Sequence, residues 1–275
     1  MTSSIGRKIT HIVLVLLGII WIYPFVWMVS SSLKSNTEYF RNGLSIIPEK
    51  LDLSNYTRAW EVANFSQYFQ NSVVLTVSTV SIVVVLCAMT GYALGRVDFW
   101  GKKLFMLAIT ATLVIPKGFT IIPLYQIILE LGLINTMPGV ILAESGGAHV
   151  LFILLFTAHF SGLPKDLEES AEMDGAGFFR TFVSVMLPLS KPIMATTIVM
   201  QFMWTWNSFL TPLVFTLNNP ELRTLSVGIS SFVGQYSSDN TGLAAAATIS
   251  VIPIIAVFIA LQKYFVEGVA GAIKG

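Results

Sequence analysis

Six long apolar runs constrain this chain more than any other feature of its sequence. They are residues 10–33, 71–95, 104–128, 137–161, 193–217 and 241–263. A helix of about twenty residues crosses the hydrocarbon core of a bilayer, where it hydrogen-bonds every backbone polar group within itself. Charged residues make up 11% of the chain, against about 25% in a soluble domain. The runs predict an all-α integral membrane protein with six transmembrane helices, in which residues 1–275 form a single transmembrane domain.

The basic residues predict which side of the membrane each segment faces. If the N-terminus is cytoplasmic, the inner segments hold ten of them: Arg7, Lys8, Arg96, Lys102, Lys103, Lys165, Arg180, Lys191, Lys263 and Lys274. The outer segments then hold five: Lys34, Arg41, Lys50, Arg58 and Arg223. Because cytoplasmic loops carry the excess of Lys and Arg, we expect both termini and the segment 162–192 in the cytoplasm.

Composition argues against several other classes of protein. The formal net charge is +1, so no overall field would attract a nucleic acid. The single cysteine, Cys87, lies in an apolar run, and the three histidines lack metal-ligand spacing, so neither a disulfide nor a metal site is expected. No paired carboxylates and no nucleophile–base spacing point to an enzyme. We expect no catalytic residue, no metal and no cofactor.

The most polar feature between two runs is the stretch from Glu168 to Pro192, "EESAEMDGAGFFRTFVSVMLPLSKP". Pro164 suits the first turn of a helix, and the carboxylates that follow it favour the positive end of a helix dipole. Gly175 and Gly177 then break the helix, and a second short helix begins near Phe178. The pattern predicts a bent helical pair that docks on another protein. An amphipathic loop on the membrane surface is the alternative.

The spacing of residues in this stretch resembles the "EAA" loop of the membrane subunits of ATP-binding-cassette importers. The matching residues are Glu169-Ser170-Ala171, Asp174-Gly175-Ala176, Leu187-Pro188-Leu189 and Pro192, with Ser170 where alanine is usual. Other segments resemble the carbohydrate-importer branch, the maltose-type inner-membrane permeases. They are "NYTRAW", "QYFQNSVVLT", "IPLY", "WNSFLTPLVF" and "QKYFVEGVAGAIKG".

The resemblance implies a permease subunit of an ATP-driven, binding-protein-dependent importer of a sugar, a di- or oligosaccharide, in the cell membrane of a prokaryote. Its implied partners are a second homologous permease subunit, two ATPase subunits, an extracytoplasmic sugar-binding protein and membrane lipid. ATP hydrolysis would belong to the ATPase subunits. The tail from Gly268 to Gly275 would enter the space between them.

The resemblance also assigns roles within the loop 162–192. It would contain the coupling helices, where Glu169 pairs with a basic residue of the ATPase and Gly175 permits close packing. The residues expected at this interface are Glu169, Ala171, Asp174, Gly175, Leu187 and Pro188.

A second group of residues is suited to a substrate pathway. Sugars bind through aromatic faces and through amide or carboxylate groups, so the expected lining residues are Glu144, Gln201, Trp204 and Asn207, with Trp206 of the same chemistry. Helix interruptions expected at Pro116, Gly118 and Pro253 mark similar depths in their runs, with simple kinks as the alternative at Pro116 and Pro253. Each lining residue has an alternative: Trp204 as a packing or interface residue, Asn207 as a bond between helices, and Glu144 as a solvated group near the run's end.

Two alternative functions stay open at this level. The same machinery could import glycerol phosphate or a polyol, although a phosphate would need more basic groups than the one intramembrane lysine, Lys117. A self-contained secondary transporter would need ion-coupling carboxylates deep in the spans. Few such carboxylates occur in the apolar runs.

Overall fold

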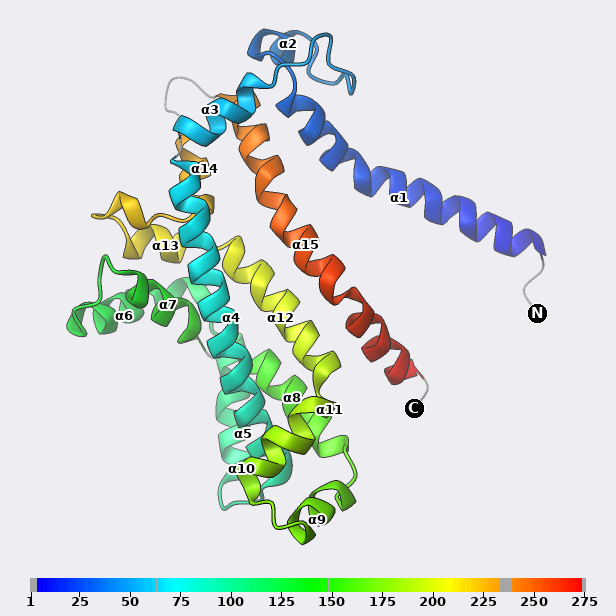
Figure 1. Ribbon diagram of the computed structural model, residues 1–275, viewed down its shortest axis with the longest axis vertical. Helices are drawn as coiled ribbons and strands as arrows, with labels where there is room; N and C mark the ends of the chain where they lie inside the picture. The colour runs from blue at the N-terminus through cyan, green and yellow to red at the C-terminus, as the bar shows by residue number, and fades with distance from the viewer. Residues whose placement is uncertain (1–3, 63, 148, 233–238, 274–275) are drawn as a thin grey trace. The chain divides into compact units, whose positions relative to one another are not determined.

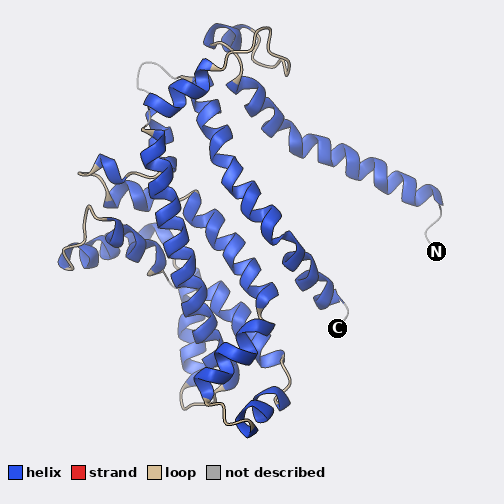
Figure 2. Ribbon diagram, in the orientation of Figure 1, coloured by secondary structure: helices blue, strands red, loops and turns tan. Residues whose placement is uncertain are grey.

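The computed structural model describes residues 4–62, 64–147, 149–232 and 239–273. Every regular element in this part of the chain is a helix, and none is a strand (Figure 2). The chain divides into two compact units, Met1–Tyr68 with Val227–Ile252 (unit 1) and Phe69–Ser226 with Pro253–Gly275 (unit 2). The prediction of a helical protein is confirmed.

Among the residues that the structure describes, three helices are long and apolar enough to cross a membrane. They are Gly6–Ser32 within α1 (Ser4–Ser32), α4 (Phe65–Arg96), and Asn240–Tyr264 within α15 (Asn240–Ile273) (Figure 1). They cover the predicted runs 10–33, 71–95 and 241–263. Pro253 lies inside α15 without ending it, so the interruption expected there is wrong. A membrane helix tolerates a proline, which has no backbone N–H, when its surroundings satisfy the carbonyl that is left without this donor.

The other apolar runs are broken. The run 104–128 forms α5 (Lys102–Ala111), the 3₁₀ turn η1 (Thr112–Val114) and α6 (Lys117–Glu130), with 110° between the two halves. Pro116 explains the break: Ile115 before it is extended, with φ −81° and ψ 116°, as a residue before proline prefers. The interruption expected at Pro116 is therefore confirmed.

Breaks also divide the two remaining runs, at positions without a proline. The run 137–161 forms α7 (Met137–Ser145) and α8 (Val150–Gly162), which meet at 56°. The run 193–217 forms α12 (Lys191–Trp206) and α13 (Leu210–Phe215). The segment Phe178–Leu189 meets α12 at 78°. Counting each bent pair as one span, the described part of the chain holds up to six candidate spans.

Unit 1 is held together by buried polar groups around α2 (Asn36–Arg41) and α3 (Ser54–Val62). Asn55, fully buried, donates to the carbonyls of Ser32 and Lys34 at 2.8 Å each. The buried Lys34 ammonium donates to the carbonyls of Asn42, Gly43 and Ser45. These bonds fold the chain after α1 back on itself, so this predicted outer segment is an ordered cap.

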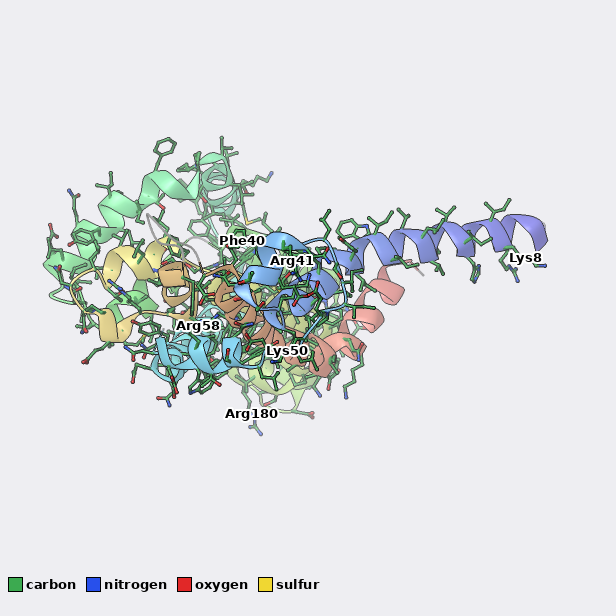
Figure 3. All side chains as sticks on the ribbon, turned by 90° about the horizontal axis from the view of Figure 1, so that it is seen from above. Lys8, Phe40, Arg41, Lys50, Arg58 and Arg180 are labelled. Carbon is green, nitrogen blue, oxygen red and sulfur yellow. The ribbon has the colours of Figure 1, made fainter. Side chains whose placement is uncertain are left out.

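An ion pair fastens this cap to the start of α15. Arg58 Nε donates to Asp239 at 2.6 Å, and Thr241 on α15 donates to Asn55 at 3.1 Å. Partial burial raises the pKa of the Asp239 carboxyl, but the hydrogen bonds from Arg58 and the Gly242 amide outweigh it and hold that pKa below its usual value. The exposed side chains Phe40, Arg41 and Lys50 lie at the α2 end of this unit (Figure 3).

Unit 2 is built around α4 and α8, which pack unusually closely. A Cβ atom on Gly91 would lie 2.4 Å from Phe156 Cβ, and one on Gly95 would lie 3.0 Å from the Thr157 carbonyl oxygen. Two glycines four residues apart give a helix a flat face against which a neighbour can pack. The core beside this contact contains Val83, Cys87, Tyr92, Phe152, Phe156, Phe160, Phe182 and Met186.

The remaining elements are short. They are α9 (Asp166–Met173), α10 (Phe178–Thr181), the π-helix η2 (Phe182–Met186), α11 (Leu187–Leu189), η3 (Pro220–Leu222), α14 (Leu225–Ile229) and η4 (Ser230–Phe232). The first four follow one another between α8 and α12, within the predicted loop 162–192. The bent helical pair expected there is present, with a π-helical turn in its second arm.

Candidate coupling loop and membrane pocket

The first arm of the loop, α9, has both ends stabilised by local sequence. Asp166, Glu168 and Glu169 lie in its first turn, where carboxylates favour the helix dipole. At its C-terminal end Gly175 has φ +80°, its N–H donates to the Glu172 carbonyl, and the Ala176 N–H donates to the Ala171 carbonyl at 2.9 Å. This pair of bonds is a Schellman motif, which needs a residue in the left-handed region.

Conformation therefore accounts for Gly175. A Cβ atom there would meet nothing within 4 Å in this chain, whereas the positive φ would strain any L side chain. The expectation that Gly175 permits close packing concerns a partner protein and stays a prediction.

The six expected coupling residues divide into outward and inward groups. Glu169, Asp174, Gly175 and Pro188 are exposed, whereas Ala171 is 7% exposed and Leu187 packs on the core of unit 2. Exposed groups are available to another protein. Ala171 and Leu187 instead fix the loop to the rest of its own chain.

Large apolar side chains flank the exposed carboxylates. Met173 is 88% exposed, Phe178 55% and Phe179 65%. Phe179 is therefore exposed, whereas Phe182 and Met186 are buried in the core of unit 2. Apolar groups beside charges on an exposed surface are typical of a protein contact.

A charged clamp, which we define as Arg96, Glu168 and Tyr92, joins this loop to α4. Arg96 lies in the last turn of α4 with its side chain 5% exposed, and it binds the Glu168 carboxylate at 2.7 Å. The Tyr92 hydroxyl, one turn earlier, donates to the other oxygen of Glu168 at 2.9 Å. Arg96 also donates to the carbonyls of Phe160 and Leu163, at 3.2 and 2.9 Å. One guanidinium thus holds the end of α4, the end of α8 and α9 together.

Aromatic packing supports the clamp. The Tyr92 ring lies 4.7 Å from that of Phe178, 5.1 Å from Phe182 and 5.4 Å from Phe160. Phe178 and Phe182 belong to the second arm of the loop, so Tyr92 contacts both arms. Sequence reasoning missed the clamp, because nothing in the sequence pairs Arg96 with Glu168 rather than with its neighbours.

A pocket of about 460 Å³ brings together the four residues expected in a substrate pathway. Its lining is Glu144, His149, Gln201, Met203, Trp204, Asn207, Ser208 and Thr211. It lies within unit 2, where the chain breaks after α7 and after α12. Helix breaks of this kind free backbone and polar side chains to face a cavity. Its volume falls within the range of small-molecule sites, about 300–1,000 Å³.

The polar groups of this pocket have defined partners. Ser208 donates to the Glu144 carboxylate, Gln201 Nε2 donates to Thr205 at 2.9 Å, and Asn207 Nδ2 donates to the Met203 carbonyl at 2.8 Å. Gln201 is 2% exposed, and its Oε1 atom has no hydrogen-bond partner among the described residues.

Aromatic residues near the pocket separate into lining and packing groups. The Trp204 ring stacks on Phe152 at 5.0 Å and stays 42% exposed. Trp206 is 4% exposed, stacks on Phe202 and meets Phe69 edge-on, so it is a packing residue and is not in the lining. His149, Ser208 and Thr211 were not expected from the sequence. Ser208 could have been found from its place directly after Asn207.

Two further expectations lie partly outside the described residues. The Lys117 side chain is one, and Lys274 and Gly275 at the end of the predicted tail are the other. Of that tail, the backbone from Gly268 to Ile273 continues α15.

Comparison with known proteins identifies the chain's family. The family described as "Binding-protein-dependent transport system inner membrane component" matches residues 87–271, which is more than half of the chain. The probable ABC transporter permease protein YurM of Bacillus subtilis is 36% identical over 98% of this chain and 90% of its own. The diacetylchitobiose uptake system permease protein NgcG of Streptomyces coelicolor is also 36% identical, over 93% and 84%.

A solved structure shares the fold of this chain. A crystal structure of a bacterial ABC transporter involved in the import of the acidic polysaccharide alginate contains a chain with a TM-score of 0.82 and 26% identity to this one. The match covers 96% of this chain and 99% of the other. The chain therefore belongs to the family of binding-protein-dependent transport system inner membrane components.

Proposed function

We propose that this chain is a permease subunit of an ATP-driven importer of di- or oligosaccharides in a prokaryotic cell membrane. Relatives that share most of its length serve such substrates by name, among them diacetylchitobiose, arabinooligosaccharides and trehalose or maltose. In this proposal the chain crosses the membrane six times with both termini in the cytoplasm, as its basic residues favour. A second permease subunit completes the pathway.

The loop 162–192 is proposed to couple this subunit to the ATPase. The observation that carries the proposal is the exposure of four residues of this loop, Glu169, Asp174, Met173 and Phe179. The loop is held to α4 by the ion pair between Arg96 and Glu168. A carboxylate among apolar groups fits a guanidinium in an apolar cleft. When ATP draws the two ATPase subunits together, α9 moves with them.

The clamp gives this movement a path into the membrane. Arg96 and Tyr92 join α9 to the last turns of α4, and Arg96 joins it also to the end of α8. Because α4 is one continuous helix of 32 residues, a displacement at its end is passed along its length. The proposed result is alternation between inward-facing and outward-facing states of the pocket.

The extracytoplasmic partner is proposed to contact the ordered cap of unit 1. Phe40 is 70% exposed there, next to Arg41 in the chain, and Lys50 is exposed in the same unit (Figure 3). The hydrogen bonds that Lys34 and Asn55 donate to backbone carbonyls hold the backbone of this cap in one conformation. A binding protein that docks on it could release its sugar toward the pathway.

The test is purification of the whole complex carrying Glu169→Lys. Reversing this exposed charge removes the bond to a basic ATPase residue, so we expect the ATPase to be lost while the second permease subunit is retained. Glu61→Lys, an exposed carboxylate on α3, is the matched control and should leave both partners bound. If the ATPase copurifies equally with Glu169→Lys and with wild type, the coupling assignment is wrong. ATP-independent sugar uptake by the wild-type chain would contradict the importer itself.

A further inference from the structure

The charges around the pocket suggest which sugars it admits. Of the eight residues that the structure describes in its lining, Glu144 carries a carboxylate, and none is Lys or Arg. His149 is the other ionisable group in the lining. With Glu144 ionised and His149 neutral, the pocket has a net negative charge.

Two groups of the pocket can accept a hydrogen bond from a ligand. An ionised carboxylate only accepts hydrogen bonds, and the buried Oε1 atom of Gln201 is an acceptor without a partner among the described residues. The amide nitrogens of Gln201 and Asn207 each use one of their two N–H groups within the chain, on Thr205 and on the Met203 carbonyl. The pocket therefore suits a ligand that brings O–H or N–H donors, and a buried acceptor left unpaired by the wrong ligand is costly.

We infer that Glu144 makes this pocket selective for uncharged or amino-substituted saccharides and excludes those that carry carboxylate or phosphate. An anionic sugar would add acceptors and a like charge, without a cation in the lining to offset them. This inference rests on the proposed function, since it names the class of sugar that the importer moves. The alginate transporter shares the fold, so selectivity between neutral and acidic sugars has to come from side chains.

The charge of the pocket can be measured without knowing the substrate. Thr211, half-buried in the lining, is replaced by cysteine in a Cys87→Ala background of the assembled complex. The new thiol is treated at about pH 8, where an ordinary histidine is neutral, with cationic trimethylammonioethyl or anionic sulfonatoethyl methanethiosulfonate. Each rate is divided by the rate with free mercaptoethanol, in the resting complex and after trapping with ATP and vanadate.

The expected result is a cation-to-anion ratio on the order of tenfold, equivalent to about 1.4 kcal/mol, because an ionised carboxylate in the same pocket attracts the cationic reagent and repels the anionic one. Adding Glu144→Gln should bring the ratio close to one, whereas Glu144→Asp should keep it. A ratio near one with Glu144 present, or one that Glu144→Gln does not change, overturns the inference. So does a thiol that reacts with neither reagent in either state, since the pocket would then be closed to solutes.

Transport separates this inference from the proposed function. A panel of neutral oligosaccharides and of matched sugars carrying one uronate is offered to the reconstituted complex with its binding protein. Uptake of a neutral member and rejection of its uronate partner is expected. If the charge ratio holds but no saccharide is moved, the proposed function fails while the pocket's charge stands. If the uronate is moved as fast as the neutral sugar, the selectivity fails and the importer stands.

Discussion

Replacing Arg96 by alanine tests whether the clamp holds the coupling loop in place. The substitution removes a side chain that is 5% exposed and leaves the Glu168 carboxylate, 21% exposed, with its bond from Tyr92 alone. It also removes the donor to the carbonyls of Phe160 and Leu163 at the end of α8. The loop should then detach from α4 more readily while each arm stays helical.

The size of the effect follows from the burial of the pair. Removing one partner of a buried ion pair costs about 3–5 kcal/mol, and an exposed pair is worth about 0–1 kcal/mol. Because Glu168 stays partly exposed to solvent and keeps the hydrogen bond from Tyr92, we expect Arg96→Ala to lower the free energy of unfolding by about 2–3 kcal/mol. Glu168→Gln can accept from Arg96 through its amide oxygen and donate from its amide nitrogen to the Tyr92 hydroxyl, so it should cost about 1 kcal/mol. The two changes share one interaction, so their combined cost should be less than the sum.

Thermal unfolding of the purified complex in detergent measures this cost. Cys87 is 3% exposed in the core next to the clamp, so its labelling by a thiol reagent, located by peptide mass spectrometry, reports when that core opens. At about 2–4 °C per kcal/mol for a chain of this size, Arg96→Ala should lower the midpoint by about 4–12 °C. Arg41→Ala is the control, because its ion pair with Glu49 is 65% and 52% exposed. Equal midpoints for Arg96→Ala and Arg41→Ala would refute the reasoning, as would a double variant whose loss is fully additive.

Three further predictions use the same preparation. Gly91→Ala should lower the midpoint by the equivalent of about 1–3 kcal/mol, because its Cβ would overlap Phe156. The control is Gly18→Ala, whose Cβ would meet nothing within 4 Å, and it should leave the midpoint unchanged or raise it slightly. Equal effects of the two changes would refute the close packing of α4 on α8. Asp239→Asn should be less stable than wild type at pH 7, because a lowered pKa means that folding favours the ionised carboxylate. The difference should begin to shrink as the pH falls below the ordinary carboxyl pKa of 3.8 and should continue to shrink toward the lower pKa of the folded state; a difference that does not shrink below pH 3.8 would contradict the ion pair with Arg58. Gly175→Ala should destabilise the end of α9 by about 1 kcal/mol, because an alanine is strained at the positive φ of this position. Amide hydrogen exchange there should become roughly fivefold faster, and unchanged exchange would contradict the left-handed cap.

The sequence predicts the helical membrane class because apolar runs have few other folds open to them. It also predicts the polar loop 162–192, whose carboxylates, glycines and prolines act on their nearest neighbours in the chain. The break at Pro116 follows from the same local rules. The interruption expected at Pro253 fails, since a proline's effect inside a membrane helix depends on what surrounds it.

What brings Glu144 to Gln201, Trp204 and Asn207 is not local. Sequence chemistry selected these residues, but their meeting in one pocket depends on how α7, α8, α12 and α13 pack after their breaks. The clamp is of the same kind, since Arg96 and Glu168 lie 72 positions apart. Periodicity and composition determine which segments enter the membrane, because the bilayer acts on each segment separately. Tertiary structure alone decides which polar groups meet inside, because a buried charge chooses its partner by distance and direction in the folded chain.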